Sequence, residues 1–177
     1  MIRKRFDTDP PARRVKVVDA FGQLGVVAVD PIAEGEVVIV VAGTTMRFPS
    51  RYSIQVGETE HAHPDETLDA AQLAAAYPWK FTNHSCRPNT RLLGRNLVAV
   101  RAIARGEPIT FDYNTTEYEM ATPFLCRCGA PGCDGRRIAG YRHLSPAEKA
   151  AIQSLLSDAL RARVAREATR APAVSGG

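Results

Sequence analysis

Asn83-His84-Ser85-Cys86-Arg87-Pro88-Asn89 lies near the middle of a chain of 177 residues, and it contains one of the chain's four cysteines. The other three follow about forty residues later, in the pattern Cys126-x-Cys128-x4-Cys133. Tetrahedral zinc takes four ligands. The later segment supplies three of them, so Cys86 is the candidate for the fourth, and the metal would then tie that segment onto residues 83–89. The alternative is four reduced cysteines without a metal, which such close clustering disfavours.

Composition and charge exclude several classes of protein. Hydrophobic residues make up 45% and charged residues 24% of the chain, which excludes a collagen-like, low-complexity or wholly disordered protein. The longest strongly apolar run, residues 37–42, is far shorter than the ~20 residues of a membrane-spanning helix. The first residues lack the apolar stretch that a secretory signal requires, so we expect a cytoplasmic protein with no membrane partner. The net charge is only +4, and the sequence has no continuous basic segment of the kind that binds nucleic acid. Nucleic acid is therefore not expected as a direct ligand.

Most of the first 113 residues read as short β-segments separated by turns. The segments share β-branched or aromatic residues and comprise 14–19, 25–29, 36–41, 52–56, 97–101 and 108–112. An Ala-rich helix is predicted for residues 69–77, ended by Pro78. His61-x-His63-x-Asp65 has spacing that could bind a metal, but an exposed polar loop is the simpler interpretation.

An internal repeat links two of these regions. Residues 27–39 (VAVDPIAEGEVVI) match residues 98–110 (VAVRAIARGEPIT). Each copy reads as a strand, a turn closed by Gly35 or Gly106, and a second strand, since glycine takes a positive φ without steric cost. Two copies are too few for a solenoid, so we interpret them as one supersecondary unit used twice.

The C-terminal region has helical character. Ser145-Pro146-Ala147-Glu148 forms a capping box, and apolar residues then recur at helical spacing. These residues are Ile152, Leu155, Leu156, Leu160 and Val164. The pattern predicts one amphipathic helix over residues 146–168 that covers the β-domain, with formation of a homodimer as the alternative role.

Several motifs together resemble the SET-domain protein lysine methyltransferases. Residues 83–89 look like the family's NHSCxPN signature, and Ile109-Thr110-Phe111-Asp112-Tyr113 resembles its second signature. The cysteine segment followed by Asp134-Gly135 is similar to the family's post-SET zinc loop, and residues 24–28 resemble the opening cofactor loop. The resemblance covers roughly residues 14–142, and its specificity lies in the order and spacing of the motifs.

The resemblance implies a mainly β fold with some α, made of small curved sheets with a pseudoknot, followed by the amphipathic helix. It divides the chain into an N-terminal arm (1–13), a SET domain (14–123), a post-SET zinc loop (124–142), a C-terminal helix (143–170) and a disordered tail (171–177). Its ligands would be S-adenosylmethionine and a structural zinc ion held by Cys86, Cys126, Cys128 and Cys133.

The resemblance also assigns the cofactor contacts. Asn83 and His84 should hold S-adenosylmethionine, and the loop of Gln23, Leu24 and Gly25 should offer it backbone groups. The family's opening loop has Gly-x-Gly, and here Gln23 stands where the first glycine would fall.

Three aromatic residues are assigned to the substrate channel. Tyr113 matches the catalytic tyrosine, and Phe111 matches the position where phenylalanine leaves room for an already methylated lysine, which implies di- or trimethylation. The family's Tyr-x-Gly reads Val41-Ala42-Gly43, so Tyr52 is the candidate to replace the missing tyrosine.

The sequence therefore favours methyl transfer from S-adenosylmethionine to the side-chain amine of lysine in a protein substrate. One alternative is the same fold acting on a small-molecule amine. The other is a cofactor- or peptide-binding module without turnover, against which the retention of Asn83, His84 and Tyr113 argues.

Overall fold

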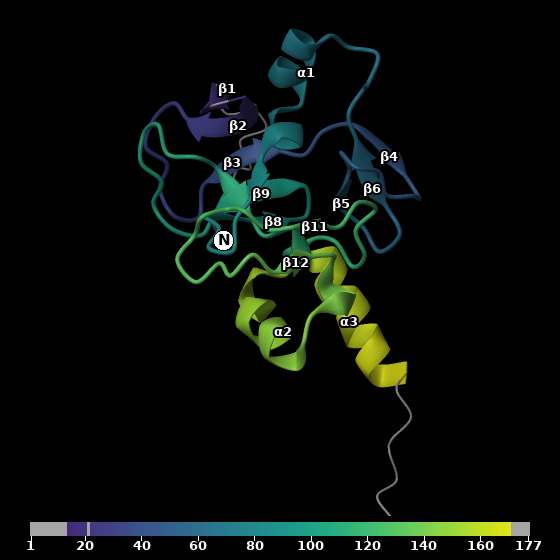
Figure 1. Ribbon diagram of the computed structural model, residues 1–177. Coiled ribbons are helices and arrows are strands. Elements are labelled where there is room, and N and C mark those ends of the chain that lie inside the picture. Colours follow the sequence, from purple (N-terminus) through teal and green to yellow (C-terminus); the bar gives the residue numbers. More distant parts are fainter. Residues whose placement is uncertain (1–13, 21, 171–177) are drawn as a thin grey trace, which may run out of the picture.

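A computed structural model describes residues 14–20 and 22–170 (Figure 1). In these residues short strands, none longer than six residues, form most of the core. The strands are β1 (Val15–Ala20), β2 (Gln23–Ala28), β3 (Val37–Val40), β4 (Thr44–Met46), β5 (Ile54–Gln55), β6 (His61–His63), β7 (Asn83–His84), β8 (Thr90–Leu93), β9 (Asn96–Ala99), β10 (Thr110–Phe111), β11 (Phe124–Leu125) and β12 (Arg137–Ile138). The arm and the tail assigned from the sequence fall outside the described residues.

The strands pair into five small sheets. β1 and β2 form an antiparallel hairpin, as do β11 and β12, whereas β7 and β10 run parallel. The two larger sheets have the strand orders β3-β9-β8 and β4-β6-β5. The parallel pair joins segments far apart in the sequence. The pseudoknot that the resemblance implies stays a prediction.

The two copies of the repeat fold against each other with reciprocal hydrogen bonds. The Ile32 amide donates to the Ile103 carbonyl and the Ile103 amide to the Ile32 carbonyl, both at 2.9 Å. Gly35 and Gly106 close the matching turns with φ of 83° and 80°. Both isoleucines are 1% exposed, so the repeat forms the centre of the core as one supersecondary unit used twice.

The first helix is confirmed. α1 (Ala70–Ala76) begins at a capping box, in which Asp69 accepts from the Gln72 amide and the Gln72 side chain accepts from the Asp69 amide. It ends at Tyr77, directly before Pro78, because the residue before a proline is disfavoured in helical conformation.

The single helix predicted over residues 146–168 is wrong: the segment forms two helices. α2 (Pro146–Ile152) runs into a 3-10 turn, and α3 (Asp158–Arg170) starts in a new direction. Ser157 causes the break, because its hydroxyl accepts from the Leu160 amide at 3.2 Å as a second N-cap, and its amide donates to the Thr115 carbonyl at 2.9 Å.

The apolar residues of α2 and α3 pack against other residues of the same chain. Leu156 and Leu160 are buried in a small second core with Tyr141, Leu144 and Ile152. In Figure 1 α2 and α3 lie together at one end of the set of sheets, with α1 at the opposite end. No helix in the described ranges is long and apolar enough to cross a membrane.

Candidate active site

The parallel pair of β7 and β10 brings the two signature stretches together. Phe111 lies opposite His84 in the register, so the chain that follows β10 passes beside the imidazole. Asp112 accepts from the Asn114 amide at 3.0 Å and so begins a 3-10 helix at Tyr113. The Tyr113 amide in turn donates to Nδ1 of His84 at 3.3 Å. Backbone pairing therefore fixes Tyr113 against His84.

The phenol of Tyr113 is held in one orientation. Its hydroxyl donates to the Thr82 carbonyl at 2.9 Å, and its ring lies 4.8 Å from the Phe111 ring, centroid to centroid. Burial, with the charge of Glu117 nearby, raises the pKa of Tyr113 to about 12. The hydroxyl therefore stays protonated at neutral pH and can act as a fixed polar group.

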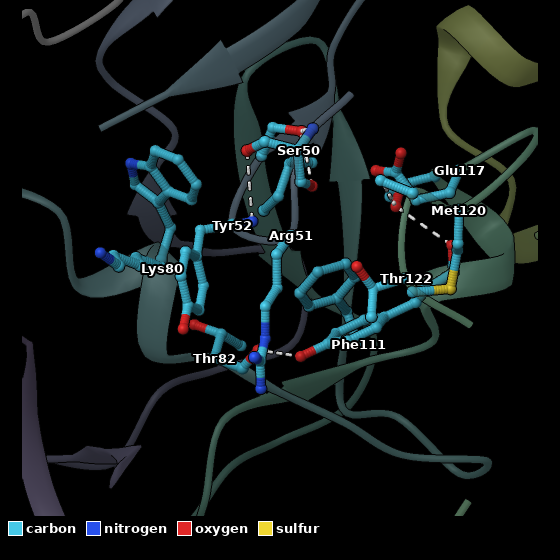
Figure 2. Close-up of a pocket in the computed structure, with 15 residues that line it drawn as sticks. Ser50, Arg51, Tyr52, Lys80, Thr82, Phe111, Glu117, Met120 and Thr122 are labelled. Atoms are coloured by element: carbon cyan, nitrogen blue, oxygen red, sulfur yellow. Dashed lines mark hydrogen bonds between the residues drawn. The ribbon is translucent and has the colours of Figure 1, made fainter. Parts of the chain in front are cut away.

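Tyr113 lines a narrow pocket of about 60 Å³, and Figure 2 labels several of the other residues that line it. Phe111, 3% exposed, lines its inner part, and Tyr52, 44% exposed, lines its outer part. The three residues assigned to a substrate channel thus border one cavity. Its volume is far below the roughly 300–1,000 Å³ that is usual for drug-sized ligands, so it suits a thin chain such as a lysine side chain.

The residues assigned to the cofactor also come together. Asn83 Nδ2 donates to the Leu24 carbonyl at 3.0 Å, and Gln23 Nε2 donates to Asn83 Oδ1 at 3.4 Å. A Cβ on Gly25 would lie 3.1 Å from Asn83 Nδ2, so glycine permits this close approach. Leu24 is 45% exposed, which leaves apolar surface beside these amides. Such a mixture fits a ligand with apolar and polar parts, as S-adenosylmethionine has.

The four cysteines converge beside His84. The ligand atoms of His84, Cys86, Cys126 and Cys128 lie within 4.8 Å of one another, with the Cys86 and Cys126 sulfurs 3.7 Å apart. Cys133 is outside that group, but its thiol contacts the thiols of Cys126 and Cys128. Zinc–sulfur bonds of about 2.3 Å in a tetrahedron require sulfurs about 3.8 Å apart, so the donor set fits zinc.

The protonation of His84 argues against it as a metal ligand. Burial and the charge of Arg136 lower the pKa of His84 to about 4, so the ring is neutral. Because Nδ1 accepts the Tyr113 amide, we assign the proton to Nε2, which lies 3.5 Å from the Cys86 sulfur. His84 then donates to that sulfur and has no free lone pair for an ion.

The thiol of Cys128 is prepared for metal binding. Burial opposes ionisation here, but the backbone amides of Cys86 and Ala130 lower the pKa of Cys128 to about 6. A thiolate at neutral pH is the form that binds a metal.

Phe124 is a site residue that the sequence analysis missed. It begins β11, and its ring centroid lies 6.0 Å from the rings of both His84 and Tyr113. Its position two residues before Cys126 could have identified it. If a metal ion holds Cys126 close to Cys86, an aromatic residue beside Cys126 must lie close to the neighbours of Cys86, which include His84.

A buried acid, Glu117, also lines the pocket and was not predicted. It accepts from the Gln55 amide at 2.7 Å and lies 3.7 Å from Nδ1 of His61. The interpretation of residues 61–65 as an exposed polar loop is wrong, since His61 and His63 lie on the central strand of the β4-β6-β5 sheet and are each 7% exposed. His63 instead bonds with the Phe48 carbonyl at 3.0 Å.

We expect Glu117→Gln to alter how folding stability depends on pH. Burial raises the pKa of Glu117 to about 7, so between about pH 4.5 and pH 7 the native state holds a proton that the unfolded chain has released. The free energy of unfolding of the wild type therefore falls as the pH rises through this range. Glutamine keeps the acceptor for the Gln55 amide without ionising, so urea unfolding should show the variant gaining about 2–3 kcal/mol on the wild type between about pH 5 and pH 8.

The control repeats this comparison with His61→Asn added to both proteins. Burial lowers the pKa of His61, which faces Glu117, so its titration must be separated from that of the acid. A stability difference between the Glu117→Gln variant and the wild type that stays constant with pH would contradict the assignment.

The comparisons with known proteins agree with this geometry. A family model described as the SET domain matches residues 23–114, more than half of the 177-residue chain. A solved structure of KRYPTONITE, in complex with mCHH DNA, an H3(1–15) peptide and SAH, has a similar fold, with a TM-score of 0.50 and 20% identity over 70% of this chain and 29% of that chain. The fold class predicted from the sequence, mainly β with some α, is confirmed.

Curated relatives match parts of the chain. Histone-lysine N-methyltransferase ash1 of Drosophila melanogaster is 34% identical over an alignment of 119 residues that covers 59% of this chain and 5% of the relative. A histone-lysine N-methyltransferase of Schizosaccharomyces pombe, H3 lysine-36 specific, is 43% identical over an alignment of 65 residues that covers 32% of this chain and 8% of the relative. The chain therefore spans less than a tenth of these relatives' lengths. With its two signature stretches paired in β7 and β10 and the family model covering the region between them, the protein belongs to the SET-domain family.

Proposed function

We propose that this protein transfers methyl groups from S-adenosylmethionine to the side-chain amine of lysine in a protein substrate. The observation that carries the proposal is the position of the Tyr113 hydroxyl, fixed on the Thr82 carbonyl at the inner part of a narrow pocket. The names of the relatives, which are histone-lysine methyltransferases, support the same reaction class.

The pocket addresses the main difficulty of the reaction. Free lysine has a pKa of about 10.4, so releasing its proton near neutral pH costs about 4 kcal/mol. Burial of the amine in the enclosed pocket, which Phe111 and Tyr113 line, removes water from it, and the positive charge of the sulfonium would lie nearby; both disfavour the charged amine and reduce that cost. The protonated Tyr113 hydroxyl and the Thr82 carbonyl can then orient the neutral amine, so that direct displacement requires mainly alignment.

S-adenosylmethionine, when bound, supplies the electrophilic methyl group. We infer that Asn83, His84 and the backbone of Leu24 hold it, on the other side of Tyr113 from the pocket. The amide of Asn83 and the uncovered apolar surface of Leu24 support this placement.

We infer a structural zinc ion held by Cys86, Cys126, Cys128 and Cys133. The sulfur spacing and the proton on His84 Nε2 support four thiolates over a set that includes histidine. The ion would hold β11, and with it Phe124, against His84 and Tyr113.

Phe111 bears on the number of methyl groups transferred. It has no hydroxyl that could hold a methylated amine away from the methyl donor, and it lies against Tyr113 in the inner part of the pocket. We propose di- or trimethylation as the outcome. A cytoplasmic location and a homodimer through the C-terminal helices stay predictions.

Calorimetric titration and a labelled-methyl assay test the proposal together. We expect the zinc-loaded protein to bind S-adenosylmethionine and S-adenosylhomocysteine with micromolar affinity, and to label lysine in lysate proteins, with two or three methyl groups per lysine by mass spectrometry. Free lysine serves as the comparison, because a small-molecule enzyme would label it faster than protein. Binding of cofactor without any labelling of protein would contradict the proposal.

A further inference from the structure

The outer part of the pocket carries two cations from different elements. Arg51 lies in the turn before β5, and Lys80 lies in the 3-10 helix that follows α1. Both face the exposed ring of Tyr52, with Lys80 Nζ 4.5 Å and the Arg51 guanidinium carbon 5.5 Å from its centroid. Figure 2 shows the Tyr52 ring between Lys80 and Arg51, with the Arg51 side chain running past that ring toward Thr82.

Neither cation forms an ion pair within the part of the chain that the structure describes. Some other arginines do lie within 4.0 Å of a carboxylate, as in the pairs Arg14–Glu36 and Arg101–Glu107. Within residues 14–20 and 22–170, no carboxylate oxygen lies that close to Arg51 or Lys80.

The acids around the pocket have other partners. Glu117, the single acidic residue among those that line it, is buried and accepts from the Gln55 amide. Glu119, on the next segment of the chain, pairs with Arg142 at 2.7 Å. The rim of the pocket therefore presents positive charge to whatever flanks an inserted side chain.

We propose that the substrate lysine lies between aspartate or glutamate residues. This inference rests on the proposed lysine methylation, because it takes the pocket as the site of the target side chain. When that side chain fills the pocket, residues within about three positions of it cross the rim, since an extended chain advances about 3.3 Å per residue. Their carboxylates would form ion pairs with Arg51 and Lys80, whereas arginine or lysine at the same positions would be repelled by these two cations.

Fluorescence anisotropy measures this preference without requiring turnover. Labelled peptides with one central lysine, flanked by Asp and Glu, by Ser and Gln, or by Arg, are titrated with the zinc-loaded protein and S-adenosylhomocysteine. We expect the acidic peptide to bind at least about fivefold more tightly than the neutral one, the basic peptide to bind most weakly, and the differences to shrink in high salt.

Charge variants connect the preference to the rim. The double variant Arg51→Glu, Lys80→Glu should reverse the order of the peptides, and Arg51→Gln, Lys80→Gln should abolish it. Arg105→Glu is the matched control, because Arg105 is exposed in the second repeat turn and does not line the pocket. Equal or tighter binding of the basic peptide, or a preference that survives the double variant, would overturn the inference.

Methyl transfer to the same peptides separates this inference from the function on which it rests. Transfer that favours the basic peptide leaves lysine methylation standing and overturns the acidic preference. An acidic preference in binding, with no transfer to any peptide or lysate protein, would instead overturn the methyltransferase proposal.

Discussion

Tyr113→Phe is expected to lower methyl transfer by about 100-fold or more while leaving the affinity for S-adenosylmethionine within about twofold. The variant removes the hydroxyl that donates to the Thr82 carbonyl, a polar group fixed at the inner part of the pocket. Removing one preorganised polar group from a reacting site costs on the order of 10²–10³ in rate. The measurement is transfer of labelled methyl to lysine, with calorimetry of cofactor binding on the same preparation.

Phenylalanine is the informative replacement because it keeps the ring. The contacts of Tyr113 with Phe111, His84 and Phe124 involve the ring faces and edges, and they remain. Tyr118→Phe is the matched control, since it removes a hydroxyl bound to Glu167 on α3, outside the pocket. Unchanged methyl transfer by Tyr113→Phe would contradict a catalytic role for Tyr113. An equal loss of methyl transfer in both variants would indicate a general effect of losing a tyrosine hydrogen bond.

The features that the sequence predicted are those with a local cause. The helix at residues 70–76 has its cap and its terminating proline in the sequence, and the repeat turns require a positive φ at Gly35 and Gly106. The resemblance of the signature stretches to the SET-domain family assigned Asn83, His84 and Tyr113 to cofactor and catalytic roles, and the pairing of β7 with β10 brings these stretches together.

The features that the sequence missed depend on distant partners. β6 shows no alternation that would separate it from a polar loop, and its histidines are buried because β4 and β5 pair on both sides of it. The break at Ser157 combines a local N-cap to the Leu160 amide with a hydrogen bond to the Thr115 carbonyl, about forty residues away, and the helical spacing of the apolar residues shows neither. Glu117 gave no signal for the same reason, since its partners Gln55 and His61 approach only in the folded chain.

Removal of zinc is expected to unfold residues 124–142 and to abolish cofactor binding. That segment contains two strands of two residues each, so metal coordination would supply most of its stability, on the order of 10 kcal/mol for a structural zinc site. Once it unfolds, Phe124 leaves the rings of His84 and Tyr113. Elemental analysis should give one zinc per chain, and hydrogen exchange after chelation should show loss of protection confined mainly to this segment.

Single substitutions then distinguish the ligand sets. Cys133→Ser should lose zinc to the same extent as Cys128→Ser if four thiolates hold the ion, although Cys133 lies outside the compact group formed by His84 and the other three cysteines. His84→Gln should retain zinc, because His84 Nε2 carries the proton that faces the Cys86 sulfur and offers the ion no lone pair. Retention of zinc in Cys133→Ser together with its loss in His84→Gln would replace Cys133 by His84 in the site. A fully reduced protein that binds no zinc at all would leave Phe124 without a metal-held anchor, and the order of the 124–142 segment would then have to come from Arg136 and its contact with buried Asp112 at 3.5 Å.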